Sequence, residues 1–359
     1  MSTLRRFLLV MLAGLLLLGG VPAAPPSLAT SASSFTLTSI DLHDGMVVQA
    51  GGTYYLYGSM YGCGYTWLVS GTPWCGFGVS TAPSMTGPWS TPTLLFDPNQ
   101  TDPFTGTSWQ TECGGTGAGC FNPRMIQRTW GPADGVWILW FNSPADYNRN
   151  HANAYNAMGC NGPGGPCGYT APNGSYHKPS LDTCAGNGDF SIVTNGTQPP
   201  EMLCTQPNQT LSEQQISYWG VDGVPSTGSN NLAALTNVEA PGAYWDAGSS
   251  HWIMTYSDPN CGYCAGDGTG YATATSLSGP WTAPSNPGVA APATGRRDLS
   301  ATSCGGQPRT VSIVDGVPWQ GIDLWTGSPN ETTAGQHFEQ LTYTGQTLPW
   351  QPFTPWPCQ

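Results

Sequence analysis

The chain has 359 residues, with 9 Lys or Arg against 21 Asp or Glu and a formal net charge of −12, so only 8% of its residues are charged. Soluble domains usually carry about 25% charged residues, and so acidic a chain argues against nucleic acid as a partner. A hydrophobic fraction of 39% suffices for a buried core and excludes a disordered chain. The 48 glycines, 33 prolines and 11% aromatic residues favour short strands and turns over long helices.

Residues 1–24 have the pattern of a secretory signal peptide. Arg5 and Arg6 precede an apolar run over residues 7–18, and residues 21–24 supply small side chains for cleavage. The run is shorter than the ~20 residues of a membrane-spanning helix, which favours cleavage over a membrane anchor. We therefore predict a secreted, extracellular protein with no membrane association after cleavage. Residues 25–34 are expected to form a flexible stretch, and residues 35–359 a single domain.

The twelve cysteines are typical of disulfides in an exported protein. Pairing neighbours in order is the simplest connectivity, although the sequence leaves others open. The resulting pairs are Cys63/Cys75, Cys113/Cys120, Cys160/Cys167, Cys184/Cys204, Cys261/Cys264 and Cys304/Cys358. Zinc at the Cys261-Gly-Tyr-Cys264 segment is the alternative, which the lack of a second such pair disfavours.

One pattern recurs along the chain, in which a turn leads into a short strand rich in aromatic and β-branched residues. The clear copies are residues 52–58, 135–141, 250–256 and 316–325, with a weaker relative at 189–196. A second element ending in Gly-Pro-Trp occurs at 78–89 and 270–281, with a degraded copy at 154–167. A helical turn is expected only at residues 211–216.

Five irregular units of this kind predict an all-β, five-bladed β-propeller, in which sheets repeat around an axis and leave only short edges. A β-sandwich whose aromatic strands are similar by coincidence is the alternative. Three carboxylates stand at the start of the innermost strand of a predicted blade, namely Asp44, Asp189 and Glu239. These starts would converge at one mouth of the axial channel, so the three would share a site, although acidic residues at such places also cap turns.

Several segments resemble glycoside hydrolase family 43, whose members are five-bladed propellers acting on plant cell-wall polysaccharides. The resemblance covers residues 40–325 and rests on segments 43–58, 188–193, 239–244 and 270–281. It implies that Asp44 is the general base, that Glu239 is the general acid, and that Asp189 tunes the pKa of that acid. It implies no cofactor.

These roles agree with the chemistry of glycoside hydrolysis, which needs one carboxylic acid to protonate the leaving oxygen and a second group to act on water. The charge of Asp189 would raise the pKa of Glu239 by repulsion and keep it protonated. The resemblance implies inversion of configuration, for which the two carboxyl groups stand about 6.5–9.5 Å apart.

Two positions resemble the β-1,3-galactanase branch of the family, with departures. Residues 121–125 are similar to a galactanase segment, but Asn122 replaces the glutamate that contacts the sugar. Gln307 stands where other members carry a metal-binding histidine and galactanases a glutamine proposed to help activate water. Galactanases typically lack an aspartate at position 44, so Asp44 and Gln307 are rival candidates for positioning the water. The missing histidine also argues against an axial calcium ion, and we predict no metal site.

Four further residues are candidates for substrate binding besides Asn122. His43 and Arg124 flank the predicted mouth, and Trp67 and Tyr263 lie in loops where their rings could stack on a sugar. Each has a purely structural alternative, since propellers also bury such residues between blades. We predict a monomeric enzyme acting on galactan, arabinan or xylan side chains, with a catalytically inactive carbohydrate-binding propeller as the alternative.

Overall fold

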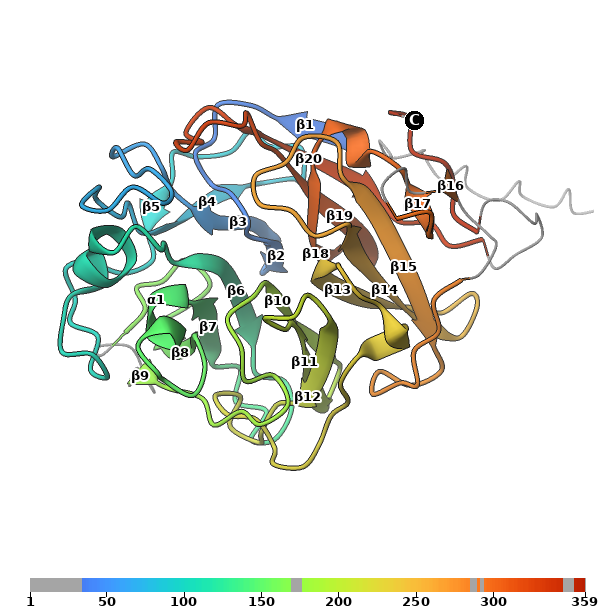
Figure 1. Ribbon diagram of the computed structural model, residues 1–359, viewed down its shortest axis with the longest axis horizontal. Coiled ribbons are helices and arrows are strands. Elements are labelled where there is room, and N and C mark those ends of the chain that lie inside the picture. The colour runs from blue at the N-terminus through green and yellow to red at the C-terminus, as the bar shows by residue number, and fades with distance from the viewer. Residues whose placement is uncertain (1–33, 169–175, 285–288, 291–293, 345–351, 359) are drawn as a thin grey trace, which may run out of the picture. The chain divides into compact units, whose positions relative to one another are not determined.

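The computed structural model describes residues 34–168, 176–284, 289–290, 294–344 and 352–358 (Figure 1). The predicted signal peptide and nearly all of the predicted flexible stretch lie outside these residues and stay predictions. In the described part of the chain, no helix is long and apolar enough to cross a membrane.

Five antiparallel sheets surround a common centre and form a five-bladed β-propeller, as the repeats predicted (Figure 1). The innermost strands are β2 (Val47–Ala50), β6 (Phe121–Gln127), β10 (Phe190–Asn195), β13 (Glu239–Asp246) and β18 (Gln307–Val314). The second strands are β3 (Thr53–Ser59), β7 (Trp137–Asn142), β11 (Gln198–Thr205), β14 (His251–Asp258) and β19 (Val317–Leu324). The third strands are β4 (Phe77–Ala82), β8 (Tyr155–Cys160), β12 (Leu211–Gln215), β15 (Gly268–Ala274) and β20 (Gly335–Gln340).

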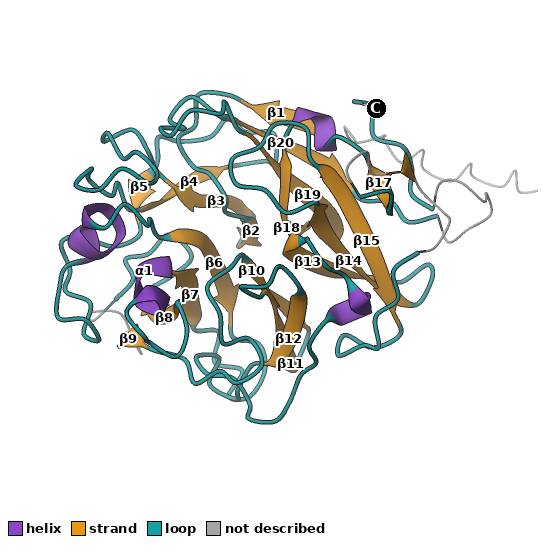
Figure 2. Cartoon of the chain, viewed as in Figure 1, coloured by secondary structure: helices purple, strands orange, loops and turns teal. Residues whose placement is uncertain are grey.

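Short outer strands complete four of the five sheets, whereas the sheet of β10, β11 and β12 has three strands among the described residues. Little helix is present (Figure 2). The outer strands are β5 (Thr93–Leu94), β9 (Tyr176–His177), β16 (Val289–Ala290), β17 (Arg297–Ser300) and β1 (Ser34–Leu37). The helical turns are α1 (Pro144–Asn148), η1 (Gln110–Gly115), η2 (Leu232–Ala234) and η3 (Ser303–Gly305). All of these turns lie between strands.

The recurring sequence elements correspond to defined strand positions, with one exception. The four clear aromatic repeats form the second strands β3, β7, β14 and β19, and the Gly-Pro-Trp elements begin on the third strands β4, β8 and β15. The weaker repeat at 189–196 instead forms the innermost strand β10, so it is not equivalent to the other four. Any strand packed on both faces carries an apolar pattern, which cannot reveal the position of a strand within its blade.

The helical turn expected at residues 211–216 is wrong, because this segment forms β12. It pairs with β11 in an antiparallel register that runs from Thr205↔Leu211 to Glu201↔Gln215. The pairing partner, which the local sequence does not contain, decides the conformation of so short a segment.

Aromatic side chains fill the spaces between neighbouring blades. Phe77 of β4 contacts Phe141 of β7 with ring centroids 5.2 Å apart, and the ring of Trp109 lies 5.1 Å from that of Phe141. All three residues are fully buried. Large apolar rings therefore stabilise the interface between the first two blades, in a chain with few residues available for ion pairs.

The fifth blade joins the two ends of the propeller. Strand β1 pairs with β20 from Ser34↔Glu339 to Leu37↔Gln336, on the side of β20 away from β19. This pairing closes the ring and covers an edge that would otherwise be exposed. The motifs of the sequence did not reveal this closure.

Replacing Phe35 of β1 with alanine is expected to lower the free energy of unfolding by about 2 kcal/mol, because a half-buried phenyl ring is lost. Its ring stacks on Phe338 at 5.0 Å and meets Trp319 edge-on at 5.6 Å. Chemical denaturation measures the change. Leu94→Ala, on the exposed edge strand β5, is the control and should cost far less. Equal losses in the two variants would contradict a stabilising role for the closing strand.

Six disulfides join the cysteines as neighbour pairing predicted. The bonded pairs are Cys63–Cys75, Cys113–Cys120, Cys160–Cys167, Cys184–Cys204, Cys261–Cys264 and Cys304–Cys358. The Cys261–Cys264 bond leaves no thiolate there for zinc.

Candidate active site

A pocket of about 360 Å³ opens where the innermost strands begin. Each blade contributes at least one polar residue to its lining from the start of its innermost strand or from the residues just before it. Among these residues are Asp44, Asn122, Asp189, Glu239 and Gln307. The structure therefore brings together all four predicted catalytic residues and one predicted sugar contact, although they are far apart in the sequence.

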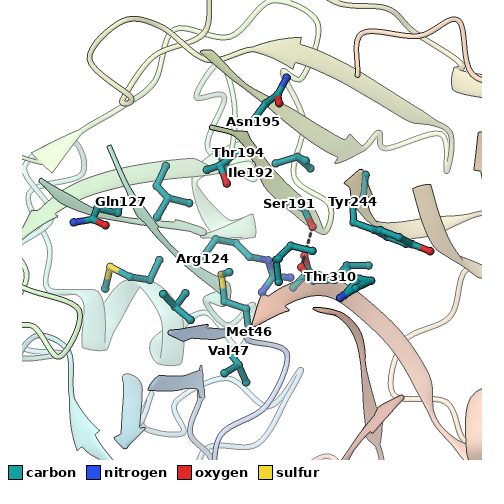
Figure 3. A pocket seen from close by; sticks show the side chains of 18 of the residues that line it. Met46, Val47, Arg124, Gln127, Ser191, Ile192, Thr194, Asn195, Tyr244 and Thr310 are labelled. Atoms are coloured by element: carbon teal, nitrogen blue, oxygen red, sulfur yellow. Dashed lines mark hydrogen bonds between the residues drawn. The ribbon is translucent and has the colours of Figure 1, made fainter. Parts of the chain in front are cut away.

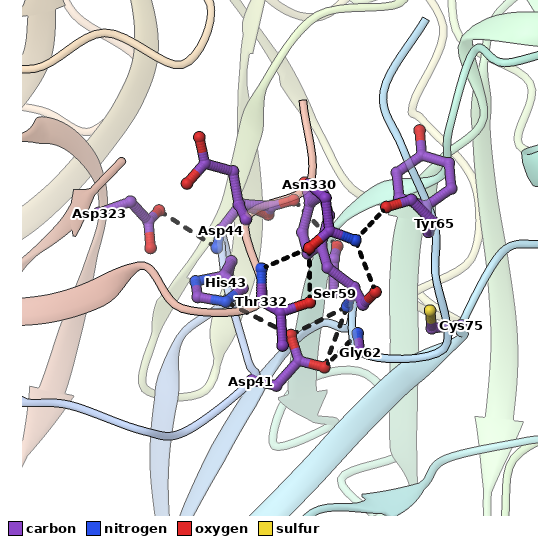
Figure 4. Close-up of polar contacts among 12 residues, drawn as sticks. Asp41, His43, Asp44, Ser59, Gly62, Tyr65, Cys75, Asp323, Asn330 and Thr332 are labelled. Carbon is purple, nitrogen blue, oxygen red and sulfur yellow. Dashed lines mark hydrogen bonds and ion pairs between the residues drawn. The ribbon is translucent and has the colours of Figure 1, made fainter. Parts of the chain in front are cut away.

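Asp44 is held by hydrogen bonds from three elements. Its Oδ1 accepts the backbone N–H of Asn122 at 2.9 Å, and its Oδ2 accepts the hydroxyl of Ser59 at 3.0 Å. Its own N–H donates to Oδ2 of Asp323 at 3.1 Å (Figure 4). Burial raises the pKa of Asp44 to about 7, helped by the charges of Asp323 and Asp189 and opposed by Arg124. Asp44 can therefore gain and lose a proton near neutral pH.

Glu239 has one occupied and one free carboxyl oxygen. Its Oε1 accepts the backbone N–H of Cys261 at 2.8 Å and Nε2 of Gln307 at 2.9 Å. No hydrogen bond to Oε2 occurs among the described residues, so a proton can reside on that oxygen. Burial raises the pKa of Glu239 well above its usual value, and the charge of Asp189 raises it further. The charge of Asp189 acts in the direction that the sequence predicted, and burial is the larger cause.

Gln307 has its amide orientation fixed by Trp325. The indole N–H of Trp325 can only donate, and it reaches Oε1 of Gln307 at 2.8 Å. Nε2 of Gln307 must then face Glu239, and it also donates to the carbonyl of Cys261 at 2.7 Å. Both of its N–H groups are engaged, so Gln307 holds Glu239 in place and has no donor left for a water molecule.

Asn122 links Asp189 to Arg124 by hydrogen bonds. Its Nδ2 donates to Oδ1 of Asp189 at 2.8 Å, and its Oδ1 accepts Nη2 of Arg124 at 2.7 Å. Burial raises the pKa of Asp189, whereas the Asn122 hydrogen bond and the charge of Arg124 oppose this rise. Much of the hydrogen-bonding capacity of Asn122 is therefore used inside the protein.

Arg124 was predicted to contact substrate, but it does not line this pocket. Its Nη1 donates to the carbonyl of Asp44 at 2.6 Å, its Nε donates to the carbonyl of Phe190 at 2.9 Å, and its side chain is buried. It borders a second hollow, near the other ends of the innermost strands (Figure 3). The register of β6 shifts between Phe121 and Arg124, and Asn122 has a left-handed φ of +57°, so Asn122 and Arg124 do not share a face as they would in a regular strand. Arg124 supports Asp44 from the side away from the pocket.

His43 does not line the pocket either, contrary to the prediction. Its ring is fully buried and lies 5.5 Å from the ring of Tyr61 and 5.6 Å from that of Trp325. Its Nε2 stands 3.5 Å from Oδ1 of Asp41 (Figure 4). The backbone turns into the left-handed region at Asp44, where φ is +54°, so Asp44 faces the pocket while His43 packs beneath it.

Aromatic rings form one wall of the pocket. Tyr263 contacts Trp67 with ring centroids 4.5 Å apart and Trp325 at 4.8 Å, and its hydroxyl lies 2.7 Å from that of Tyr61. The predicted candidates Trp67 and Tyr263 thus line the pocket, and Tyr61 and Trp325 join them. The last two were missed, although Tyr61 follows the first aromatic repeat closely and Trp325 ends the fourth.

Comparison with known proteins identifies the fold. No family model matches the sequence, and no curated protein matches it. Solved structures do match, among them an exo-β-1,3-galactanase from Phanerochaete chrysosporium with β-1,3-galactotriose (TM-score 0.62, 15% identity, 87% of this chain and 65% of that one). A second is an exo-β-1,3-galactanase from Clostridium thermocellum (TM-score 0.58, 14% identity, 85% of this chain and 60% of that one). A third is a GH43 β-1,3-galactosidase with galactodeoxynojirimycin (TM-score 0.63, 12% identity, 88% of this chain and 95% of that one).

The chain therefore has the five-bladed propeller fold of family 43 galactanases and galactosidases. It spans about 65% of the length of the Phanerochaete enzyme. The resemblance that the motifs indicated is confirmed at the level of the fold.

Proposed function

We propose that the protein is a secreted glycoside hydrolase that removes galactose from β-1,3-linked galactan by an inverting acid/base mechanism. The observation that carries this proposal is the pairing of two carboxyl groups in one pocket. Glu239 is kept protonated by burial, and Asp44, with a pKa of about 7, can be ionised. Such a pair of unlike carboxyl groups is what glycoside hydrolysis requires.

In the proposed reaction, Glu239 gives the proton on Oε2 to the glycosidic oxygen as the bond to the anomeric carbon breaks. Asp44 accepts a proton from the water that attacks the opposite face of the sugar. Gln307 and Cys261 hold Oε1 of Glu239, and the negative charge of Asp189 helps to keep the acid protonated. The predicted separation of about 6.5–9.5 Å between acid and base belongs to this proposal.

The lining of the pocket favours a neutral sugar. Asp44 and Asp189 would repel an anionic one, while the ring of Trp67 or Tyr263 offers an apolar face for stacking. Galactose is favoured over arabinose or xylose by the galactanase-like segments around Asn122 and Gln307 and by the galactose-related ligands of the similar structures. Six disulfides and the pattern of residues 1–24 support an extracellular site of action.

The decisive test is a panel of β-1,3-galactotriose, arabinan and xylan, with products followed by proton NMR. We expect galactose to be released from the galactotriose and to appear first as the α-anomer, because inversion of a β-linkage gives an α-product. Release of the β-anomer would contradict the inverting mechanism. Binding of galactotriose with no hydrolysis of any substrate would instead establish a carbohydrate-binding propeller.

A further inference from the structure

The loop over residues 259–267, between β14 and β15, carries one side of the pocket. Near its start, the N–H of Asn260 donates a hydrogen bond to the carbonyl of Asn237 at 3.0 Å. At its end, the N–H of Asp267 donates to the carbonyl of Gly306 at 2.9 Å. Between these two hydrogen bonds, the disulfide Cys261–Cys264 joins residues three apart in the sequence. Cys261, Gly262 and Tyr263, which all line the pocket, lie within the small ring that this bond closes.

The peptide groups of Cys261 make direct contacts with the acid and its neighbour. The N–H donates to Oε1 of Glu239 at 2.8 Å, and the carbonyl accepts Nε2 of Gln307 at 2.7 Å. Nε2 of Gln307 reaches the same Oε1 at 2.9 Å. The position of Glu239 Oε1 is thus set by two donors, Cys261 and Gln307, which are also hydrogen-bonded to each other, and Cys261 belongs to the disulfide ring.

Tyr263, inside the same ring, has a backbone conformation that needs support. Its φ is +54°, in the left-handed region that an aromatic residue rarely adopts and that persists when surrounding structure imposes it. Its ring packs on Trp67 and Trp325, and its hydroxyl meets that of Tyr61. The disulfide limits the backbone on both sides of this residue.

We propose that the Cys261–Cys264 disulfide is a positioning element for Glu239, which holds the Cys261 peptide where it occupies Oε1 and leaves Oε2 to carry the proton that is transferred. This inference rests on the proposed function. Without the bond, residues 261–264 gain conformational freedom, the N–H of Cys261 is presented to Glu239 for less of the time, and the carboxyl group can rotate. A misplacement of about 1 Å can cost about 10²-fold in rate.

A purely stabilising role is the weaker explanation for this bond. The stabilisation by a disulfide grows with the length of the loop that it closes. The partners of Cys261–Cys264 are only three residues apart, whereas those of Cys304–Cys358 are 54 apart. The shortest of the six crosslinks is the one whose backbone contacts Glu239 and Gln307.

The test compares two substrates in the double variant Cys261→Ser/Cys264→Ser. Hydrolysis of β-1,3-galactobiose needs protonation of its leaving group, whereas 2,4-dinitrophenyl β-galactoside releases a stable phenolate without it. We expect kcat for galactobiose to fall about 10²-fold and kcat for the aryl galactoside to change less than about threefold. The control is Cys160→Ser/Cys167→Ser, which removes another short disulfide whose cysteines do not line the pocket. We expect it to leave the ratio of the two rates unchanged.

The positioning role would be overturned if kcat of the double variant fell equally on both substrates or on neither. It would also be overturned if the control variant showed the same change in the ratio of the two rates. An inactive wild-type protein would overturn the proposed function and this inference together, whereas an active wild type with an unchanged ratio in the variant overturns the inference alone. Thermal unfolding reports whether the double variant folds. If it does not, the ratio is followed on wild-type protein during reduction, with the reduced pairs assigned by mass spectrometry, since Cys261 and Cys264 are partly exposed and Cys160 and Cys167 are buried.

Discussion

Glu239→Gln is expected to lower kcat for β-1,3-galactobiose by about 10³-fold or more, because the amide cannot donate an acidic proton to the leaving oxygen. The substitution preserves shape, and the new Oε1 can still accept the N–H groups of Cys261 and Gln307. Binding of galactobiose, measured by calorimetry, should therefore remain. Hydrolysis of 2,4-dinitrophenyl β-galactoside should be affected much less, since its leaving group departs without protonation.

Glu201→Gln is the matched control for that change. Glu201 is also buried, and burial raises its pKa to about 7, but it lies on β11 and does not line the pocket. We expect its kcat to stay close to that of the wild type. Unchanged turnover of galactobiose by the Glu239 variant would exclude Glu239 as the acid.

Asp44→Asn is expected to lower kcat by about 10²–10⁴-fold, because the amide cannot accept a proton from water. Asparagine tolerates the left-handed backbone of this position, where φ is +54°. Azide, a nucleophile that needs no deprotonation, should restore turnover and form the glycosyl azide of inverted configuration, which NMR detects. Asp315→Asn replaces another left-handed aspartate outside the pocket and should retain activity and show no azide effect.

The pH profile of wild-type kcat/KM should show the titrations of both Asp44 and Glu239. Asp44 acts as the ionised form, so kcat/KM should fall as the pH drops through its pKa of about 7. Glu239 acts as the protonated form, so kcat/KM should also fall as the pH rises through the raised pKa of that group. The residual activity of the Asp44 variant should lack the acidic limb near pH 7. An acidic limb that persists unchanged in this variant would assign that limb to another residue.

The sequence predicted the propeller because its repeats are local. An aromatic strand of about seven residues and a Gly-Pro-Trp turn are readable within a short window. The disulfides are predictable for a similar reason, since five of the six join cysteines at most 20 residues apart. Asp44, Asp189 and Glu239 share a pocket because each stands at or near the start of an innermost strand, and those starts meet at one end of the channel.

Other features depend on contacts between distant segments. The segment that forms β12 is a strand because β11 pairs with it, and β1 closes the fifth blade because β20 is present beside it. Gln307 faces Glu239 and has no N–H left for a water molecule, because Trp325 fixes its amide and Cys261 takes its second N–H.

The sequence by itself thus predicted the fold class, the simplest pairing of the cysteines and the carboxylates that gather at the mouth of the propeller. Only the tertiary structure decided which neighbours those carboxylates have. His43 and Arg124 were expected to contact the sugar, yet one packs under Asp44 and the other braces it from behind. The physical reason is that the residue type sets the chemistry of a side chain, whereas the path of the backbone sets the direction in which that side chain points.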